Sequence, residues 1–140
     1  MTNEWTDDLS TEIEWINDQH KELFERIYLL SLAFEGGKGK EEIIYTLKFL
    51  QDYIIVHFKD EEDLQIKYNY PHYLSHKELH KEFVNDFNKF KYQVINQGIS
   101  SNLAYEVKQK LTEWLKKHIN IVDRAMAEHM VKHLETIASQ

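Results

Sequence analysis

The chain has 140 residues with no Cys, one Pro and four Gly, and its formal net charge is −7 at pH 7. This length favours a single domain, and the absence of Cys excludes disulfides. The negative charge argues against nucleic acid or an anionic membrane as partners, since both require basic patches. Because no apolar run is long enough to cross a bilayer and the first residues do not combine a basic segment with an apolar run, we expect a soluble, cytoplasmic protein.

Breaks at Gly36-Gly37, Asn69-Tyr70-Pro71 and Gly98 divide a chain that is otherwise rich in helix-forming residues. Between these breaks, apolar residues recur at alternating steps of four and three, which is the period of packed helices. The predicted elements are an arm at 1–16, helices at 17–36, 40–66, 71–97 and 101–121, and a short C-terminal helix at 124–138.

The two ends of the chain are less regular than its middle. Asn17 is the expected cap of the first helix, and Thr11 with Glu14 forms a rival capping box that would start the helix earlier. We expect Trp5 and Leu9 to fold the arm against the rest of the protein. The C-terminal helix carries apolar residues along one side, namely Met126, Met130, Leu134 and Ile137.

Short connections make consecutive helices antiparallel, so the sequence predicts an all-α, up-down-up-down antiparallel four-helix bundle. Polar side chains interrupt the apolar seam of each helix: early in the first, late in the second, early in the third and late in the fourth. In this topology all of these positions lie at the same end of the bundle. They are His20, His57, Glu61, His76, His80 and His118.

Polar groups in core positions cost free energy unless they are compensated, and a bound metal pair would compensate this cluster. The simpler interpretation, a hydrogen-bonded core histidine, fits one such residue but not five at one level. Glu61 also favours metal, since a carboxylate is almost never placed on an apolar seam without a partner. We interpret His129 and His133 as surface residues, although they too are four apart, and His72 as a cap or turn residue.

Asp123 is a further candidate ligand, five residues after His118. The position on the same helix face as His118 would be Val122. A ligand at Asp123 therefore requires the helix to end, or to contain a local bulge, between the two residues.

These residues resemble the motifs of the hemerythrins, and most closely those of single-domain bacterial hemerythrins. Asn17 stands where that family usually has Asp, and Asn caps a helix equally well. The similarity runs through nearly the whole chain, in family order and spacing. The matching motifs are Ile16-Asn-Asp-Gln-His20, His57-Phe58-x-x-Glu61-Glu62, His76-x-x-x-His80 and Trp114-x-x-x-His118-Ile119-x-x-x-Asp123.

The resemblance implies a non-haem di-iron centre that binds dioxygen reversibly. One iron would be held by His76, His80 and His118, and the other by His20 and His57. Glu61 and Asp123 would each bridge both metals, together with an oxo or hydroxo group. This ligand count leaves one position vacant, on the iron with fewer histidines. The residues matching the family's oxygen pocket are all apolar: Leu23, Phe58, Trp114 and Ile119.

Histidines outnumber carboxylates in this set, which favours release of bound oxygen over its cleavage, because fewer anionic ligands stabilise high oxidation states less. We therefore expect an oxygen-binding protein for storage, delivery or sensing rather than an enzyme. The alternative is an enzyme on the same centre, such as a peroxide or nitric oxide reductase or an iron oxidase. A zinc-bearing or metal-free interaction module is a third interpretation, since imidazole and carboxylate also suit zinc.

Overall fold

A computed structural model describes residues 4–98 and 100–138, and the main chain there is almost entirely helical. The prediction of an all-α fold is confirmed, and the described residues contain no strand. A 3-10 turn at Asp7–Leu9 and a π-helical turn, η2, at His118–Asp123 accompany the longer helices. Those helices are α1 (Glu14–Glu35), α2 (Lys40–Lys67), α3 (Tyr73–Gln97), α4 (Ser101–Lys117) and α5 (Arg124–Ala138).

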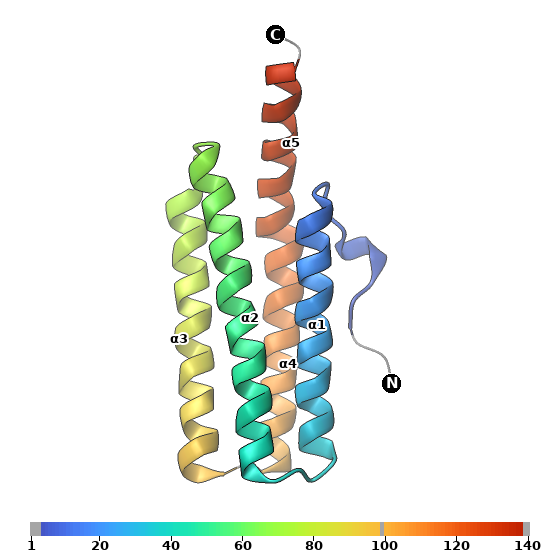
Figure 1. Cartoon of the computed structure of the whole chain (residues 1–140), viewed down its shortest axis with the longest axis vertical. Helices are drawn as coiled ribbons and strands as arrows, with labels where there is room; N and C mark the ends of the chain where they lie inside the picture. Colours follow the sequence, from blue (N-terminus) through green and yellow to red (C-terminus); the bar gives the residue numbers. More distant parts are fainter. Residues whose placement is uncertain (1–3, 99, 139–140) are drawn as a thin grey trace.

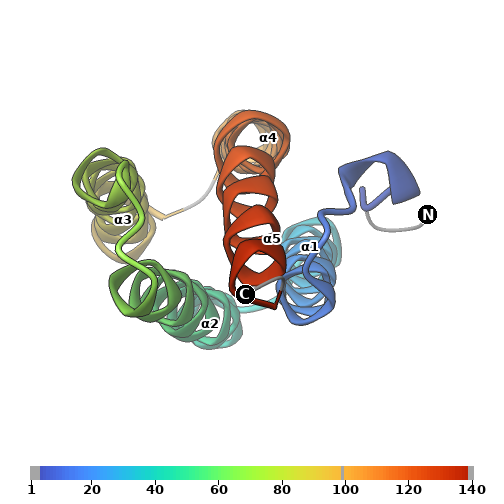
Figure 2. The same cartoon turned by 90° about the horizontal axis from the view of Figure 1, so that it is seen from above.

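The first four helices run alternately down and up, as the short connections predicted (Figure 1). η2 and α5 continue the direction of α4, so the chain forms one long rod from Ser101 onward that extends past the end of the bundle. Seen from above, α3 and α4 stand apart on one side, whereas α1 and α2 lie close together (Figure 2). The backbones of α3 and α4 are therefore more widely separated than those of α1 and α2.

Residues in the left-handed backbone region end three of the helices. Gly37 has φ 62° after α1, Asn69 has φ 53° after α2, and Gly98 has φ 78° after α3. After each of the first two, an amide donates to a carbonyl five residues earlier: Lys38 to Ala33 at 3.2 Å and Tyr70 to Gln65 at 2.9 Å. These bonds satisfy carbonyl groups that the helix end leaves unpaired, so the breaks seen in the sequence are built as helix C-caps.

Both predictions for the start of α1 are wrong. The N-cap position is occupied by Ile13, whose side chain makes no cap hydrogen bond, and α1 begins at Glu14 rather than at residue 17. Asn17 is buried instead of capping: its Oδ1 accepts from the Thr11 amide at 2.7 Å, and its Nδ2 donates to the Thr11 carbonyl at 2.9 Å. The side chain therefore ties the arm to α1 through Thr11.

Other boundaries differ less. α3 begins at Tyr73 rather than at 71, because the chain completes its turn through Pro71 and His72, and His72 takes the N-cap position as the sequence suggested. α4 ends at Lys117 rather than at 121, because η2 takes over at His118.

The arm packs on the bundle as expected. Leu9 is buried in the main core, and the Trp5 ring lies 6.1 Å from that of Phe24. On α5, Met126 and Met130 are buried in a smaller cluster with Ile16 and Tyr70, whereas Leu134 is exposed. The side chain of Ile137 lies outside the described residues. Among the helices described, none is both long enough and apolar enough to pass through a bilayer.

Candidate metal centre

The structure brings together all seven polar residues singled out in the sequence. α1 supplies His20, α2 supplies His57 and Glu61, α3 supplies His76 and His80, and η2 supplies His118 and Asp123. All seven are buried, and His20, Glu61 and Asp123 have no exposed surface. The side chains form two overlapping groups that share both carboxylates.

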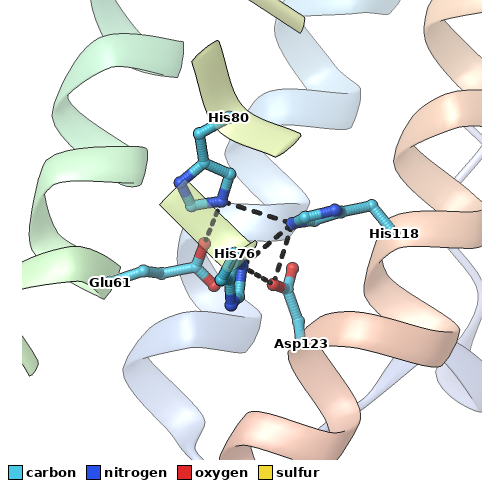
Figure 3. A group of neighbouring side chains, drawn as sticks. All are labelled: Glu61, His76, His80, His118 and Asp123. Carbon is cyan, nitrogen blue, oxygen red and sulfur yellow. Dashed lines mark hydrogen bonds and ion pairs between the residues drawn. The ribbon is translucent and has the colours of Figure 1, made fainter. Parts of the chain in front are cut away.

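The first group contains three histidines, His76, His80 and His118 (Figure 3). The Nε2 atoms of His76 and His118 each lie 3.1 Å from Asp123 Oδ1, and they lie 3.1 Å from one another. His80 Nε2 lies 3.4 Å from Glu61 Oε1 and 3.3 Å from His118 Nε2. Three imidazoles and two carboxylates therefore present their ligating atoms to one small volume.

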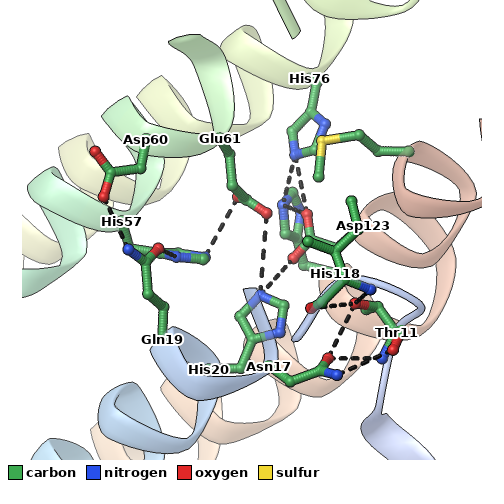
Figure 4. Close-up of polar contacts among 12 residues, drawn as sticks. Thr11, Asn17, Gln19, His20, His57, Asp60, Glu61, His76, His118 and Asp123 are labelled. Carbon is green, nitrogen blue, oxygen red and sulfur yellow. Dashed lines mark hydrogen bonds and ion pairs between the residues drawn. The ribbon is translucent and has the colours of Figure 1, made fainter. Parts of the chain in front are cut away.

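The second group contains two histidines, His20 and His57 (Figure 4). His20 Nε2 lies 3.0 Å from Asp123 Oδ2 and 4.0 Å from Glu61 Oε2, and His57 Nε2 lies 3.3 Å from Glu61 Oε1. Asp123 thus turns one oxygen to each group, which is the disposition of a carboxylate between two centres.

Asp123 reaches the cluster because of the π-helical turn. In a regular α-helix, a residue five positions after His118 would point about 140° away from it around the axis. The chain from His118 to Asp123 instead winds as a π-helix, which inserts one extra residue into the turn. Of the two alternatives that the sequence left open, the end of the helix or a local bulge, the structure has the bulge, and both residues face the same interior.

Many polar atoms of the cluster form no hydrogen bond with any described residue. They are both ring nitrogens of His20, Nε2 of His57 and all four carboxylate oxygens of Glu61 and Asp123. Buried polar atoms without partners cost free energy, so a site of this kind is poorly explained as a structural core. Metal coordination would satisfy the four oxygens and the Nε2 atoms of His20 and His57, since imidazole and carboxylate groups are ordinary ligands for divalent transition metals.

Burial controls the protonation of these groups in the metal-free chain. It raises the pKa of Glu61 well above its usual value, and the neighbouring Asp123 charge adds to the rise. For Asp123 burial acts in the same direction, but the surrounding histidines, His118 foremost, outweigh it and hold the pKa well below normal. Burial lowers the pKa of His80 to about 2 and that of His57 well below its normal value. These two imidazoles are therefore neutral at pH 7, as a metal ligand must be.

A ring of polar side chains orients the ligands from outside. His57 Nδ1 lies 2.7 Å from Gln19 Oε1, and the Gln19 amide in turn donates to Asp60 at 2.8 Å (Figure 4). His80 Nδ1 lies 2.9 Å from Glu62 Oε2. Such partners fix which ring nitrogen would face a bound metal. The sequence reasoning missed their role, although Gln19 and Glu62 each stand next to a ligand in the chain.

Apolar side chains surround the cluster on its inner side. The Phe58 ring stacks on His80 at 3.7 Å, and the Trp114 ring stacks on His118 at 4.4 Å. Leu23 and Ile119 are buried nearby in the same core. Trp114 also borders a groove of about 680 Å³ between α3 and α4, where aromatic residues from Phe83 to Phe90 line the α3 side.

The remaining histidines lie apart from the cluster. His133 is exposed, His129 is partly exposed and packs near the Tyr70 ring at 5.2 Å, and His72 is exposed at the start of α3. Within the described residues, none of the three belongs to a group able to hold a metal.

Comparison with known proteins places these features in a family. The model of the hemerythrin HHE cation binding domain matches residues 11–130. A bacteriohemerythrin of Pseudomonas paraeruginosa is 32% identical over 129 residues, covering 92% of this chain and 81% of the relative. A hemerythrin-like protein of Naegleria gruberi is 37% identical over 104 residues, covering 74% and 73%.

A crystal structure of a hemerythrin mutant superposes with a TM-score of 0.81 at 27% identity, covering 93% of this chain and 96% of that one. The similarity therefore extends over the helices that carry the cluster as well as over the bundle itself. The chain belongs to the hemerythrin family.

Proposed function

We propose that this protein holds two iron ions in the buried cluster and binds dioxygen reversibly. The observation that carries the proposal is the division of the seven side chains into a three-histidine group and a two-histidine group with both carboxylates in common. His76, His80 and His118 would hold one iron, and His20 and His57 the other. Glu61 and Asp123 would bridge them, with an oxo or hydroxo group completing the pair.

The unequal number of histidines gives the two positions different roles. The two-histidine position has fewer protein ligands, so it is the one that leaves room for a small molecule. A reduced iron pair would supply the electrons for binding dioxygen, and the protein would keep that site dry. Leu23, Phe58, Trp114 and Ile119 would exclude water from it, because each is apolar and at least partly buried.

The groove between α3 and α4 is consistent with entry of a small apolar ligand. Phe83, Leu111 and Trp114 line both this groove and a small apolar pocket beside Phe58. Apolar side chains therefore connect the groove to the Phe58 ring, which stacks on His80. A neutral diatomic gas enters such surroundings at lower cost than an ion or a polar substrate does.

Iron stoichiometry combined with visible spectra tests the proposal. The reduced protein should contain about two irons per chain, gain a charge-transfer band on exposure to air, and lose it again when oxygen is removed. Bound zinc would give no such colour, and steady-state turnover of peroxide or nitric oxide without a reversible oxygen isotherm would favour an enzyme instead. Either result would refute reversible oxygen binding as the function.

A further inference from the structure

Gln65 lies on α2, one turn after Glu61, and has no exposed surface. Its Nε2 atom lies 2.9 Å from His76 Nδ1 and 2.8 Å from the Met126 sulfur. Its Oε1 atom is buried and forms no hydrogen bond with any described residue. A buried amide with one end paired twice and the other end unpaired requires a physical explanation.

The pairing determines where the proton of His76 lies. An amide nitrogen only donates, so His76 Nδ1 accepts from Gln65. A neutral imidazole carries one proton, which must then be on Nε2, and that nitrogen lies 3.1 Å from Asp123 Oδ1. Nε2 is, however, the atom that faces the other cluster residues and would have to lose its proton to bind a metal.

The other ligands with outer partners are arranged differently. His57 Nδ1 faces the carbonyl oxygen of Gln19, and His80 Nδ1 faces a carboxylate oxygen of Glu62. Both partners are acceptors, so these rings already hold the proton on Nδ1 and leave Nε2 free. Among these three histidines, His76 alone meets a donor.

We propose that Gln65 is a positioning residue for His76, and that the Gln65 amide rotates by about 180° when a metal binds. This inference rests on the metal centre proposed above. With metal on Nε2, the proton of the neutral ring resides on Nδ1, and the Gln65 oxygen becomes its acceptor. One proton leaves Nε2 and one occupies Nδ1, so the ring stays neutral. The rotation changes no volume: it gives up the bond to the Met126 sulfur and leaves Nε2 unpaired in place of Oε1, in exchange for the bond from His76 Nδ1 to Oε1.

Nitrogen NMR of ¹⁵N-histidine protein tests this directly, with Zn²⁺ as a diamagnetic probe. The metal-free chain should show His76 protonated on Nε2, and the zinc-loaded chain should show it protonated on Nδ1. His57 and His80 should carry the Nδ1 proton in both states. Finding the His76 proton on Nδ1 before metal is added would overturn the proposal.

Variants give a second measurement that does not depend on the wild-type spectra. Gln65→Met keeps the side-chain length but removes the acceptor, so Zn²⁺ affinity should fall about 10–100-fold, as for other outer partners of metal-bound histidines. Gln65→Glu supplies an acceptor without a donor and should bind at least as tightly as the wild type. Equal affinity in Gln65→Met and wild type would refute the role of Gln65.

Gln51→Met is the matched control. Gln51 lies on the same helix and is also hydrogen-bonded, but its partners are Asn88 and Lys91, neither of which belongs to the cluster. It should leave Zn²⁺ affinity unchanged. Wild-type protein that takes up neither Zn²⁺ nor Fe²⁺ would refute the metal centre itself, whereas normal uptake with an unchanged His76 tautomer would refute only the inference about Gln65.

Discussion

His118 and Asp123 are five residues apart in the chain, yet His118 Nε2 and Asp123 Oδ1 lie 3.1 Å apart. The π-helical turn that spans them makes this contact possible. A π-turn is less stable than an α-turn and persists where a functional site uses it. Here it brings the Asp123 carboxylate to the cluster beside His118, so that two candidate ligands come from one turn.

Deleting Asn120, which is exposed in that turn, should convert it to a regular α-helix. Asp123 would then follow His118 by four residues, about 40° around the axis, and would stay on the same face as His118. We therefore expect the deletion variant to keep about two irons per chain, as Asn120→Ala, which keeps the chain length, should also do. Elemental analysis of both purified variants measures the result. Loss of iron in the deletion variant alone would show that the extra residue is itself needed.

His118→Ala should abolish stoichiometric iron binding, because it removes a ring that contacts both His76 and Asp123. Elemental analysis of the purified protein measures the result. His133→Ala is the control, since His133 is an exposed histidine on the same rod, and it should keep about two irons per chain. Loss of iron in the control, or its retention in His118→Ala, would contradict the assignment.

Glu61→Gln should stabilise the metal-free chain at neutral pH while removing its ability to load iron. Burial raises the pKa of Glu61 above the ordinary value of 4.5, so ionising it as the pH rises costs stability. Glutamine does not ionise and avoids that cost. A gain of about 1 kcal/mol at pH 8 would raise the melting temperature by about 4 °C.

The pH dependence of the stability gain in Glu61→Gln separates the ionisation of Glu61 from a change in packing. The protonated carboxyl contributes its stability below about pH 4.5, and that stability is lost as the pH rises through the folded pKa. The difference between Glu61→Gln and the wild type should therefore shrink toward pH 4. Thermal unfolding of both chelator-treated proteins from pH 4 to 8 measures it, and a difference that does not vary with pH would exclude ionisation as its cause.

Trp114→Ala should leave the iron content intact but accelerate autoxidation several-fold. The Trp114 ring stacks on His118 and borders the α3–α4 groove, so its removal would admit water. The decay of the oxygenated spectrum gives the rate. Trp15→Ala, at an exposed tryptophan on α1, is the matched control. Equal rates in the two variants would remove Trp114 from the pocket.

The main features of the fold and the cluster could be predicted because the spacing of residues along a helix indicates which of them are buried. Leu47, Leu50 and Ile54 have the same spacing as His57 and Glu61, and all five are buried. Short connections then placed the polar positions of four helices at one end. For Asp123, the five-residue spacing did not fit an α-helix and left two alternatives, the end of the helix or a local bulge, between which the sequence did not decide.

Features that depend on side-chain choice at the edges of the helix faces could not be predicted. Nothing in the sequence shows that Asn17 pairs with Thr11 rather than capping α1, because both roles use the same polar atoms. Glu62 and Gln65 lie where a side chain can turn inward or outward, and only tertiary packing decides which. The separation of α3 from α4 depends on interhelical distances, which periodicity does not determine.

The unpaired polar atoms of the cluster also affect the lifetime of the protein, because they make the metal-free chain less stable than the metal-bound one. A metal that binds only the native chain adds stability by mass action, about 4 kcal/mol when its concentration exceeds the dissociation constant a thousandfold. Under the proposed function, chains without iron open more often and become substrates for proteases. Iron supply would then regulate the amount of the protein through its turnover, without any change in its synthesis.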